Sequence, residues 1–227
     1  MTTIPYAIRR SSRARHARIV VDPSGVEVVV PQRMPLREVE PFVAEKRQWI
    51  ERTLRRYEQA RQAGPAVELR DGGRVPYLGR ELALSVRAEP GRRRAHVALR
   101  GDSLQVKLGE THSLRATLEA WYRRRARAEI APRLDAAVAR AGTRYTSLTI
   151  RAQRTRWASC SDRGSMSFNW RLLLAPEEIL DYVVEHEVAH LEVMGHSRRF
   201  WALVGRRCPD YRERERWLRR YGSTLRL

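Results

Sequence analysis

Apolar residues recur along this chain with two periods, and a change of period indicates a change of element. From residue 35 to about residue 63, apolar side chains return every three, four or seven positions, which predicts a helix. Before and after it, short alternating or β-branched runs separated by glycine and proline predict strands over residues 6–10, 18–21, 26–30, 74–79, 81–86, 96–99 and 103–108. We expect the first three strands to form a small meander.

The second half of the chain begins with a long helical pattern. Ser113 can cap its first turn, and Gly142 can end it in a left-handed conformation. Strands are then expected over residues 148–151 and 154–160. The strict alternation of apolar and polar residues over 164–173 predicts a third strand, with the clearest period of two in the chain.

Three more helices are expected after that strand. The first has Pro176 at its first position and Gly195 at its left-handed end. The second is capped by Ser197. The third begins where Asp210 and Glu213 can form a capping box.

These elements predict an α+β protein of two parts, with a boundary at the break near residues 109–113. Residues 1–110 are expected to form a smaller, β-rich part with one long helix. Residues 111–227 are expected to pack long helices against a small antiparallel-edged sheet. A chain of 227 residues is long enough to bury a substantial core.

One segment carries recognisable chemistry: residues 182–191 read YVVEHEVAHL. Positions four apart share a helix face, so His186 and His190 can bind one metal ion while Glu187 reaches the water bound to it. Zinc favours imidazole ligands, and a hydrolytic zinc site needs three protein ligands and one open position. His196, in the expected corner between two helices, is the candidate for the third ligand.

Two other interpretations of this segment stay open. The histidines of an amphipathic helix can simply satisfy local hydrogen bonds, although the third histidine and the expected helix ends favour a metal site. The position of His196 also fits a metzincin. Against that clan, the glycine stands at Gly195 rather than midway, and no methionine follows His196 to form a Met-turn.

The chain is strongly basic, with a formal net charge of +19 from 45 basic and 26 acidic residues. Only Lys46 and Lys107 are lysines. Arginine binds phosphate bidentately, so the runs 92–94, 123–125 and 212–220 are candidate contacts for nucleic acid or the ribosome. A coding bias toward arginine with a solvated basic surface explains the same composition equally well.

No stretch of the sequence approaches the length of a membrane span, and no apolar run follows the first arginines. We therefore expect a cytoplasmic protein without membrane contact. Cys160 and Cys208 lie far apart and belong to no C-x-x-C pair, which argues against a thiolate metal site or a disulfide framework. We expect both thiols to be reduced.

Further short segments surround the histidine motif in the C-terminal half. They read TRWASC at 155–160, MSFNWR at 166–171, HEVAH at 186–190, HSRRFW at 196–201 and CPDY at 208–211. Together they resemble the YgjP-like (WLM-like) family of zinc metallopeptidases, relatives of the SprT-type proteases. The family's usual R-W-G-S-C has alanine here, at Ala158, which puts in doubt any backbone role that requires glycine at that point.

The resemblance implies a zincin-like, gluzincin-type core that hydrolyses peptide bonds in a peptide or protein substrate. It assigns a zinc ion to His186, His190 and His196, and it makes Glu187 the general base. Zinc bound by three neutral histidines can lower the pKa of its bound water from 15.7 to about 7.

Substrate contacts are less sharply indicated by the sequence. If residues 164–173 form an exposed edge strand beside the motif helix, an extended peptide can add to it through backbone hydrogen bonds. Arg156 and Tyr211 are candidates for stabilising the oxyanion, and Asn169 is a further candidate for substrate binding.

Two alternative functions stay open. Some members of the family that this chain resembles are described as UTP pyrophosphatases, and arginines can hold a triphosphate. Phosphoryl hydrolysis usually uses magnesium bound by carboxylates, however, and the sequence has no tight acidic cluster outside the motif helix. The chain could also be a nucleic-acid-binding module with a vestigial peptidase site, although a degenerate site would be free to lose Glu187.

Overall fold

The computed structural model describes residues 4–22, 25–63, 67–153 and 155–227. Contacts between residues divide the chain into two compact units, Met1–Gly64 and Pro65–Leu227. Helices and small mixed sheets occur in both units, so the expected α+β class is confirmed. The expected division between residues 110 and 111 lies inside the second unit and stays a prediction.

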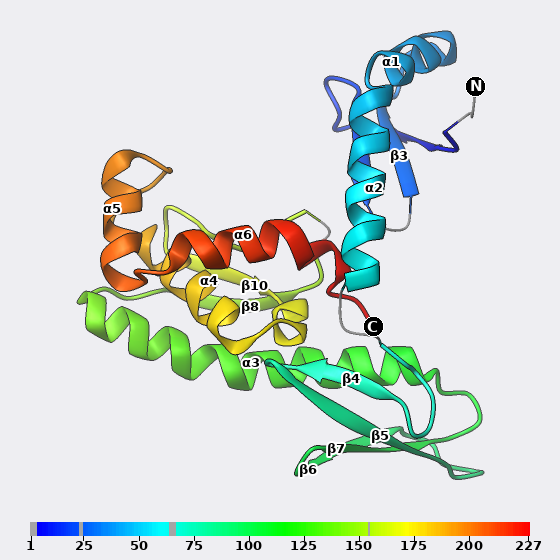
Figure 1. The fold of residues 1–227 in the computed structure, drawn as a ribbon, viewed down its shortest axis with the longest axis vertical. Coiled ribbons are helices and arrows are strands. Elements are labelled where there is room, and N and C mark those ends of the chain that lie inside the picture. Colours follow the sequence, from blue (N-terminus) through cyan, green and yellow to red (C-terminus); the bar gives the residue numbers. More distant parts are fainter. Residues whose placement is uncertain (1–3, 23–24, 64–66, 154) are drawn as a thin grey trace. The chain divides into compact units, whose positions relative to one another are not determined.

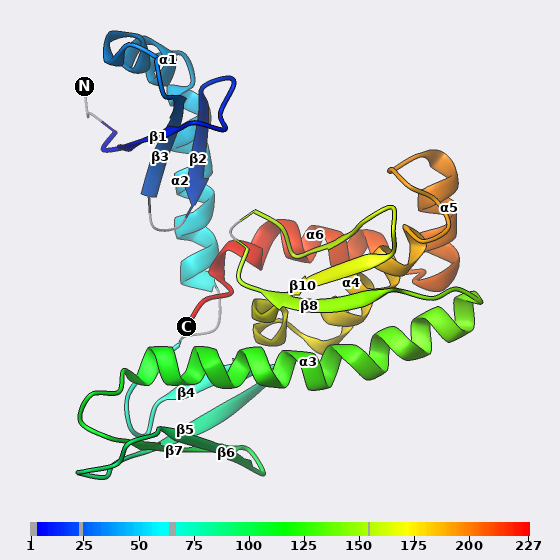
Figure 2. The ribbon, with the colours of Figure 1, turned by 180° about the vertical axis from the view of Figure 1, so that it is seen from behind.

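The first unit contains a three-stranded sheet, visible in Figure 2. Its strands are β1 (Ala7–Ser11), β2 (Arg18–Asp22) and β3 (Gly25–Pro31), in the order β1-β3-β2. β3 pairs parallel with β1 and antiparallel with β2, so the expected meander is wrong. β3 lies between the other two strands, and its Val28, Val29 and Val30 are fully buried.

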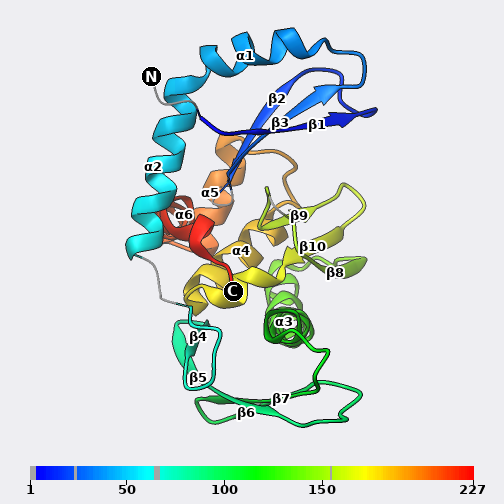
Figure 3. The same ribbon diagram turned by 90° about the vertical axis from the view of Figure 1, so that its right-hand side faces the viewer.

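Helices cover this sheet on one side (Figure 3). A short 3-10 helix, η1 (Leu36–Glu38), leads into α1 (Val39–Glu45), and α2 (Arg47–Ala63) follows. The single helix expected here is therefore interrupted at Lys46, whose φ of −94° and ψ of 4° lie outside the helical region. The core of the unit joins apolar residues of the helices and the sheet, namely Val26, Val28, Val30, Val39, Val43 and Ile50.

The second unit opens with a four-stranded sheet in the order β4-β5-β7-β6. Its strands are β4 (Arg74–Tyr77), β5 (Arg80–Ala88), β6 (His96–Arg100) and β7 (Ser103–Leu108). All four expected strands are present, but the one expected over 74–79 ends at Tyr77, before a turn at residues 78 and 79. β5 pairs parallel with β7, and the other neighbours are antiparallel.

The helix α3 (Leu114–Ala141) lies between this sheet and a second one, as Figures 1 and 3 show. The Ser113 hydroxyl accepts a hydrogen bond from the Ala116 N–H at 3.4 Å, and Gly142 ends the helix with a φ of 63°. Both expected ends are confirmed. Fully buried residues along the helix, including Leu118, Ile130 and Leu134, belong to the main core of the unit.

The second sheet contains β8 (Ser147–Arg151), β9 (Ala158–Cys160) and β10 (Ser165–Asn169), in the order β8-β10-β9. β10 pairs parallel with β8 and antiparallel with β9. The expected antiparallel-edged sheet is therefore wrong at β8, and β10 is central rather than an edge. Arg154, in the strand expected over 154–160, lies outside the described residues.

The alternating segment at 164–173 is only partly a strand. After Asn169 the chain turns into a 3-10 helix, η2 (Trp170–Leu174), so the expected strand is too long. The turn buries Trp170, Leu172 and Leu173 together, whereas a strand would have directed Leu173 to the face opposite Trp170 and Leu172.

The last helices are α4 (Glu177–Ala189), α5 (Arg198–Arg207) and α6 (Tyr211–Tyr221). α4 begins after Pro176 but ends well before Gly195, because bonds from residues 190–192 to the carbonyls three positions earlier tighten its end. Ser197 caps α5 as expected. Asp210 precedes α6 but makes no side-chain cap hydrogen bond, so the expected capping box is wrong.

None of the helices in the described part of the chain has the length and apolar character that a membrane crossing requires.

We expect Leu134→Ala to lower the free energy of unfolding by about 2–5 kcal/mol, because it opens a cavity in α3 at a fully buried position. Urea unfolding measures the change. Arg124→Ala, at an exposed position of the same helix, is the matched control and should stay within about 0.5 kcal/mol of the parent chain. Equal effects of the two substitutions would contradict the position of α3 in the core.

Candidate metal centre

α4 and its C-cap residue carry His186, Glu187 and His190 in the second unit. The buried apolar residues of α4 belong to the main core of the unit, and the helix packs against α3 and η2. His186 and His190 are half-buried, and Glu187 is only 6% exposed. The motif therefore lies largely out of water, which an exposed amphipathic helix would not achieve.

His196 reaches the other two histidines from the turn after α4. Its Nε2 lies 3.2 Å from the Nε2 of His186, and one ring nitrogen from each of the three residues lies within 4.8 Å of the others. A tetrahedral zinc ion with Zn–N bonds of about 2.0–2.1 Å sets its nitrogen ligands about 3.3 Å apart. The triad therefore has a spacing that can hold one divalent ion.

Phe200 forms the floor under this triad. Its ring stacks on His190 at 4.4 Å and meets the rings of His186 and His196 at 4.9 Å each. Phe200 is fully buried and lies in the first turn of α5, which the Ser197 hydroxyl caps by accepting the Phe200 N–H at 3.3 Å. The cap of α5 thus helps to position the Phe200 ring, which contacts all three imidazoles.

The surroundings of His186 and His190 favour neutral imidazoles. Burial, followed by the neighbouring His190 and His196, lowers the pKa of His186 to about 3. Burial also lowers the pKa of His190, whose Nδ1 lies 3.4 Å from the carbonyl oxygen of Val193. A proton on that Nδ1 leaves Nε2 free as a ligand atom. A metal ion binds only the neutral ring, so the donor set fits a divalent metal.

Glu187 lies beside the triad with one carboxylate oxygen, Oε2, buried and without a hydrogen-bond partner. Burial raises the pKa of Glu187 to about 7, while a hydrogen bond from the Cys160 backbone and the charge of Arg156 act in the opposite direction. A carboxyl with a pKa near neutrality can both accept and release a proton, as a general base requires.

The backbone of β9 borders this carboxylate. The Trp157 carbonyl accepts a bond from the Asn169 N–H at 2.7 Å, and the Ser161 N–H donates to the Ser165 carbonyl at 2.9 Å. Backbone groups alternate in direction along an antiparallel strand, so those of Ala158 and Cys160 point away from β10. Ala158 has no positive φ, and its backbone conformation therefore does not require glycine.

The three residues expected to contact substrate are not equivalent. Arg156 lines a hollow of about 320 Å³ together with His186 and Glu187. Tyr211 lines a second hollow on the side of His196. Asn169 is 2% exposed, and its amide donates to the carbonyls of Gln153 at 2.8 Å and Arg156 at 3.3 Å. Asn169 therefore holds the loop before β9 instead of facing either hollow.

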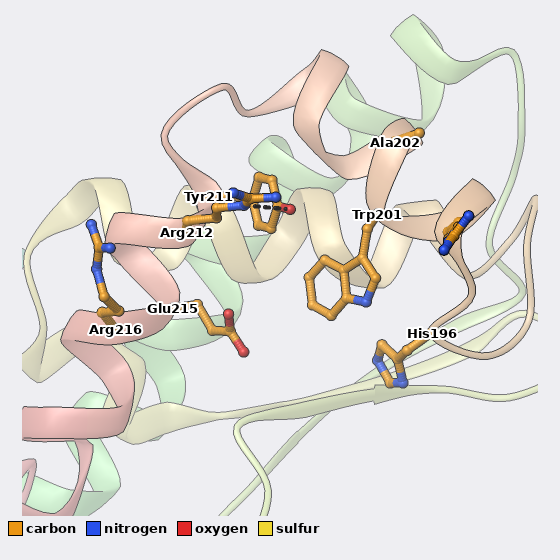
Figure 4. Close-up of a pocket in the computed structure, with 8 residues that line it drawn as sticks. His196, Trp201, Ala202, Tyr211, Arg212, Glu215 and Arg216 are labelled. Carbon is orange, nitrogen blue, oxygen red and sulfur yellow. Dashed lines mark hydrogen bonds between the residues drawn. The ribbon is translucent and has the colours of Figure 1, made fainter.

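The second hollow has a volume of about 750 Å³ and adjoins the triad at His196 (Figure 4). Its remaining lining residues come from the first two turns of α5 and α6, namely Arg198, Trp201, Ala202, Tyr211, Arg212, Glu215 and Arg216. Trp201 stacks on His196 with ring centroids 5.6 Å apart. Glu215 lines both hollows.

Sequence reasoning missed the roles of Phe200, Trp201 and Cys160. The first two belong to the quoted HSRRFW segment, and a capped helix start directly after a ligand histidine was the available signal. The contribution of Cys160 is its backbone, for which side-chain chemistry gives no signal. Its thiol has a pKa raised to about 11, first by burial and then by the charge of Glu187.

Some arginines of the runs expected to contact phosphate already have partners within the protein. Arg125 donates to the Tyr77 hydroxyl at 2.7 Å and pairs with Glu129 at 2.8 Å. Arg92 pairs with Glu89 at 2.6 Å. Two of the residues expected to contact phosphate are therefore occupied within the protein, while Arg123 and Arg124 are exposed.

A histidine triad beside a buried carboxyl of raised pKa equips this chain for metal-dependent hydrolysis. The family described as "YgjP-like, metallopeptidase domain" matches residues 15–221, and the protein belongs to that family. Its membership makes it a metal-dependent peptidase at the level of the family, with a peptide or protein substrate.

Comparison with curated proteins gives no match. Among solved structures, the crystal structure of the metallopeptidase zymogen of Pyrococcus abyssi abylysin matches with 27% sequence identity and a TM-score of 0.36. The match covers 39% of this chain and 91% of that one.

Proposed function

We propose that this protein is a zinc metallopeptidase of the gluzincin type, with His186, His190 and His196 as zinc ligands and Glu187 as general base. The observation that carries the proposal is the convergence of three imidazole nitrogens within 4.8 Å of one another beside a carboxyl that is 6% exposed. Three imidazoles without a carboxylate or thiolate ligand suit zinc better than magnesium or calcium.

Zinc, when bound, supplies a Lewis acid that polarises the scissile carbonyl and acidifies water. The protein's own residues divide the remaining tasks. The three neutral imidazoles leave the charge of the ion undiminished, because none of them is anionic. Glu187 accepts a proton at its unpartnered Oε2 and returns it to the leaving amine, and its raised pKa suits both steps.

An extended substrate would pair with β9 rather than with β10. The earlier expectation named residues 164–173, but β10 already has a neighbour on each side. Ala158 directs its N–H and C=O away from β10 and lines the hollow that contains His186 and Glu187. Addition of a strand there would position many peptide sequences with little dependence on their side chains.

The two alternative functions have weaker support. The triad provides no carboxylate ligands for the magnesium that phosphoryl hydrolysis usually needs. A vestigial site would have no reason to keep a buried carboxylate oxygen without a hydrogen-bond partner, because burial of such a group costs free energy.

We expect His190→Ala to abolish stoichiometric zinc binding, because two imidazoles cannot complete the site. Elemental analysis after dialysis should give about one zinc per chain in the parent protein and close to none in the variant. His96→Ala, which removes an exposed histidine far from the triad in the sequence, is the control and should keep its zinc. Full zinc content in His190→Ala would remove this residue from the ligand set.

We expect Glu187→Gln to keep the fold and the zinc but to lower kcat for peptide hydrolysis by about 10²–10⁴-fold, because the amide preserves the shape and cannot accept the proton. Glu178→Gln, at an exposed position of the same helix, should be unaffected. Turnover close to that of the parent enzyme would show that another group is the base.

We expect Ala158→Pro to raise KM for unstructured peptides up to about tenfold, because proline removes one outward N–H that the substrate would use. Ala158→Gly keeps this N–H and should leave KM near the parent value. Circular dichroism and urea unfolding check that β9 still pairs with β10. If a folded Ala158→Pro variant kept an unchanged KM, pairing of the substrate at this position would be ruled out.

A further inference from the structure

The hollow on the side of His196 carries an excess of positive charge that the proposed hydrolysis does not use. Arg198, Arg212 and Arg216 line it. Its one carboxylate, Glu215, is neutralised by Arg219, whose Nη2 lies 2.7 Å away. Within the described residues, neither Arg198 nor Arg216 has a hydrogen-bond or ion-pair partner, so two guanidinium groups are available to a ligand.

A stack of aromatic rings connects this charge to the metal centre. Trp201 lies between His196 and Tyr211, with ring centroids 5.6 Å and 5.3 Å away and interplanar angles of 28° and 19° (Figure 4). Arg212 Nε donates to the Tyr211 hydroxyl at 3.1 Å. The position of Arg212 is therefore tied to that of a metal ligand through successive stacked side chains.

The close approach of α5 and α6 makes this stack possible. Tyr211 lies at the start of α6, and a Cβ built on Gly205 of α5 would lie 3.4 Å from its ring. A Cβ at that distance would be in ordinary van der Waals contact with the ring, so only a side chain longer than that of alanine would be crowded against Tyr211. The packing of α5 against α6 therefore holds the stack of His196, Trp201 and Tyr211 in place, and the exposed arginines lie beside it.

We propose that this hollow is an anion-binding subsite, which selects peptide substrates that carry a carboxylate next to the scissile bond. The inference rests on the proposed function, because it assumes that a peptide carbonyl occupies the metal centre. A residue adjoining that carbonyl would then extend past His196 along Trp201 and Tyr211. Its methylene groups would contact the rings while its carboxylate met the arginine side chains.

Both the acidic side chains and a free C-terminus of a polypeptide provide the required carboxylate. The arginines are exposed, so each pair contributes little and the preference should be screened by salt. Three such pairs together predict a preference of about tenfold for an acidic over an isosteric neutral residue.

The test uses the zinc-loaded full chain and matched quenched fluorescent peptides. One pair carries glutamate or glutamine beside the cleaved bond, and a second pair ends in a free carboxylate or an amide at the same distance. We expect kcat/KM to favour the anionic member of at least one pair by about tenfold at low salt, and the ratio to fall toward one in 1 M salt. The pair that responds identifies the source of the carboxylate. Equal rates within both pairs at low salt would overturn the proposal.

Substitution of the arginines assigns the preference to this hollow. Arg198→Gln, Arg212→Gln and Arg216→Gln combined should bring the ratio close to one. The control combines Arg115→Gln, Arg123→Gln and Arg124→Gln on α3, which removes the same charge from exposed positions and should keep the ratio. Arg216→Glu should turn the preference toward a lysine peptide. A ratio that survives the first combination would overturn the assignment.

Binding measurements separate this proposal from the proposed function. In the Glu187→Gln background, fluorescence anisotropy of the same labelled peptides reports affinity without turnover. Tighter binding of the carboxylate peptide, lost in the arginine combination, would support the subsite even if the parent chain cleaved no peptide. If the combination instead abolished hydrolysis of UTP and left peptide affinity unchanged, the hollow would be a phosphate site and the proposal would be wrong.

Discussion

Removal of the motif face of α4 from water is the constraint on which the rest of the site depends. The same apolar surroundings lower the pKa of His186 and raise that of Glu187, so burial prepares the ligands and the base together. In water the histidines would be partly protonated near pH 6.5 and the carboxyl would be too weak a base. α3, η2 and α5 produce this environment because they pack around α4 and beneath the triad.

Arg133 holds α4 against α3 and so maintains that burial. From the middle of α3 it pairs with Glu129 on its own helix and with Glu177 and Asp181 in the first turns of α4. Glu129 in turn accepts a 2.7 Å hydrogen bond from the hydroxyl of Tyr77 at the end of β4. Arg133 and Glu129 are only 20% and 17% exposed, which limits solvent screening of their pair within α3. The partners on α4 are more exposed, Glu177 at 56% and Asp181 at 48%, so the two pairs between the helices are partly screened by water.

Features encoded by nearby residues were predictable from the sequence, and features that depend on distant contacts were not. Ser113, Gly142 and Ser197 end or begin helices through bonds to neighbours, and the i, i+4 histidines share a face on any helix. The order of strands in both corrected sheets depends on which strand the whole fold buries, which alternation alone does not reveal. The stacking of Phe200 and the outward backbone of β9 likewise exist only once α5 and β10 are in place.

Net charge is a poor guide to where this chain attracts an anion. Arg125 and Arg133, although part of the basic excess, stabilise the packing of α3 and are unavailable to a partner. The potential at a site falls off within about 8–10 Å at physiological ionic strength, so dispersed surface arginines contribute little there. Arg198, Arg212 and Arg216 line the same hollow as the metal ligand His196. Selectivity among anionic ligands therefore follows from where the arginines lie more than from the formal net charge of +19.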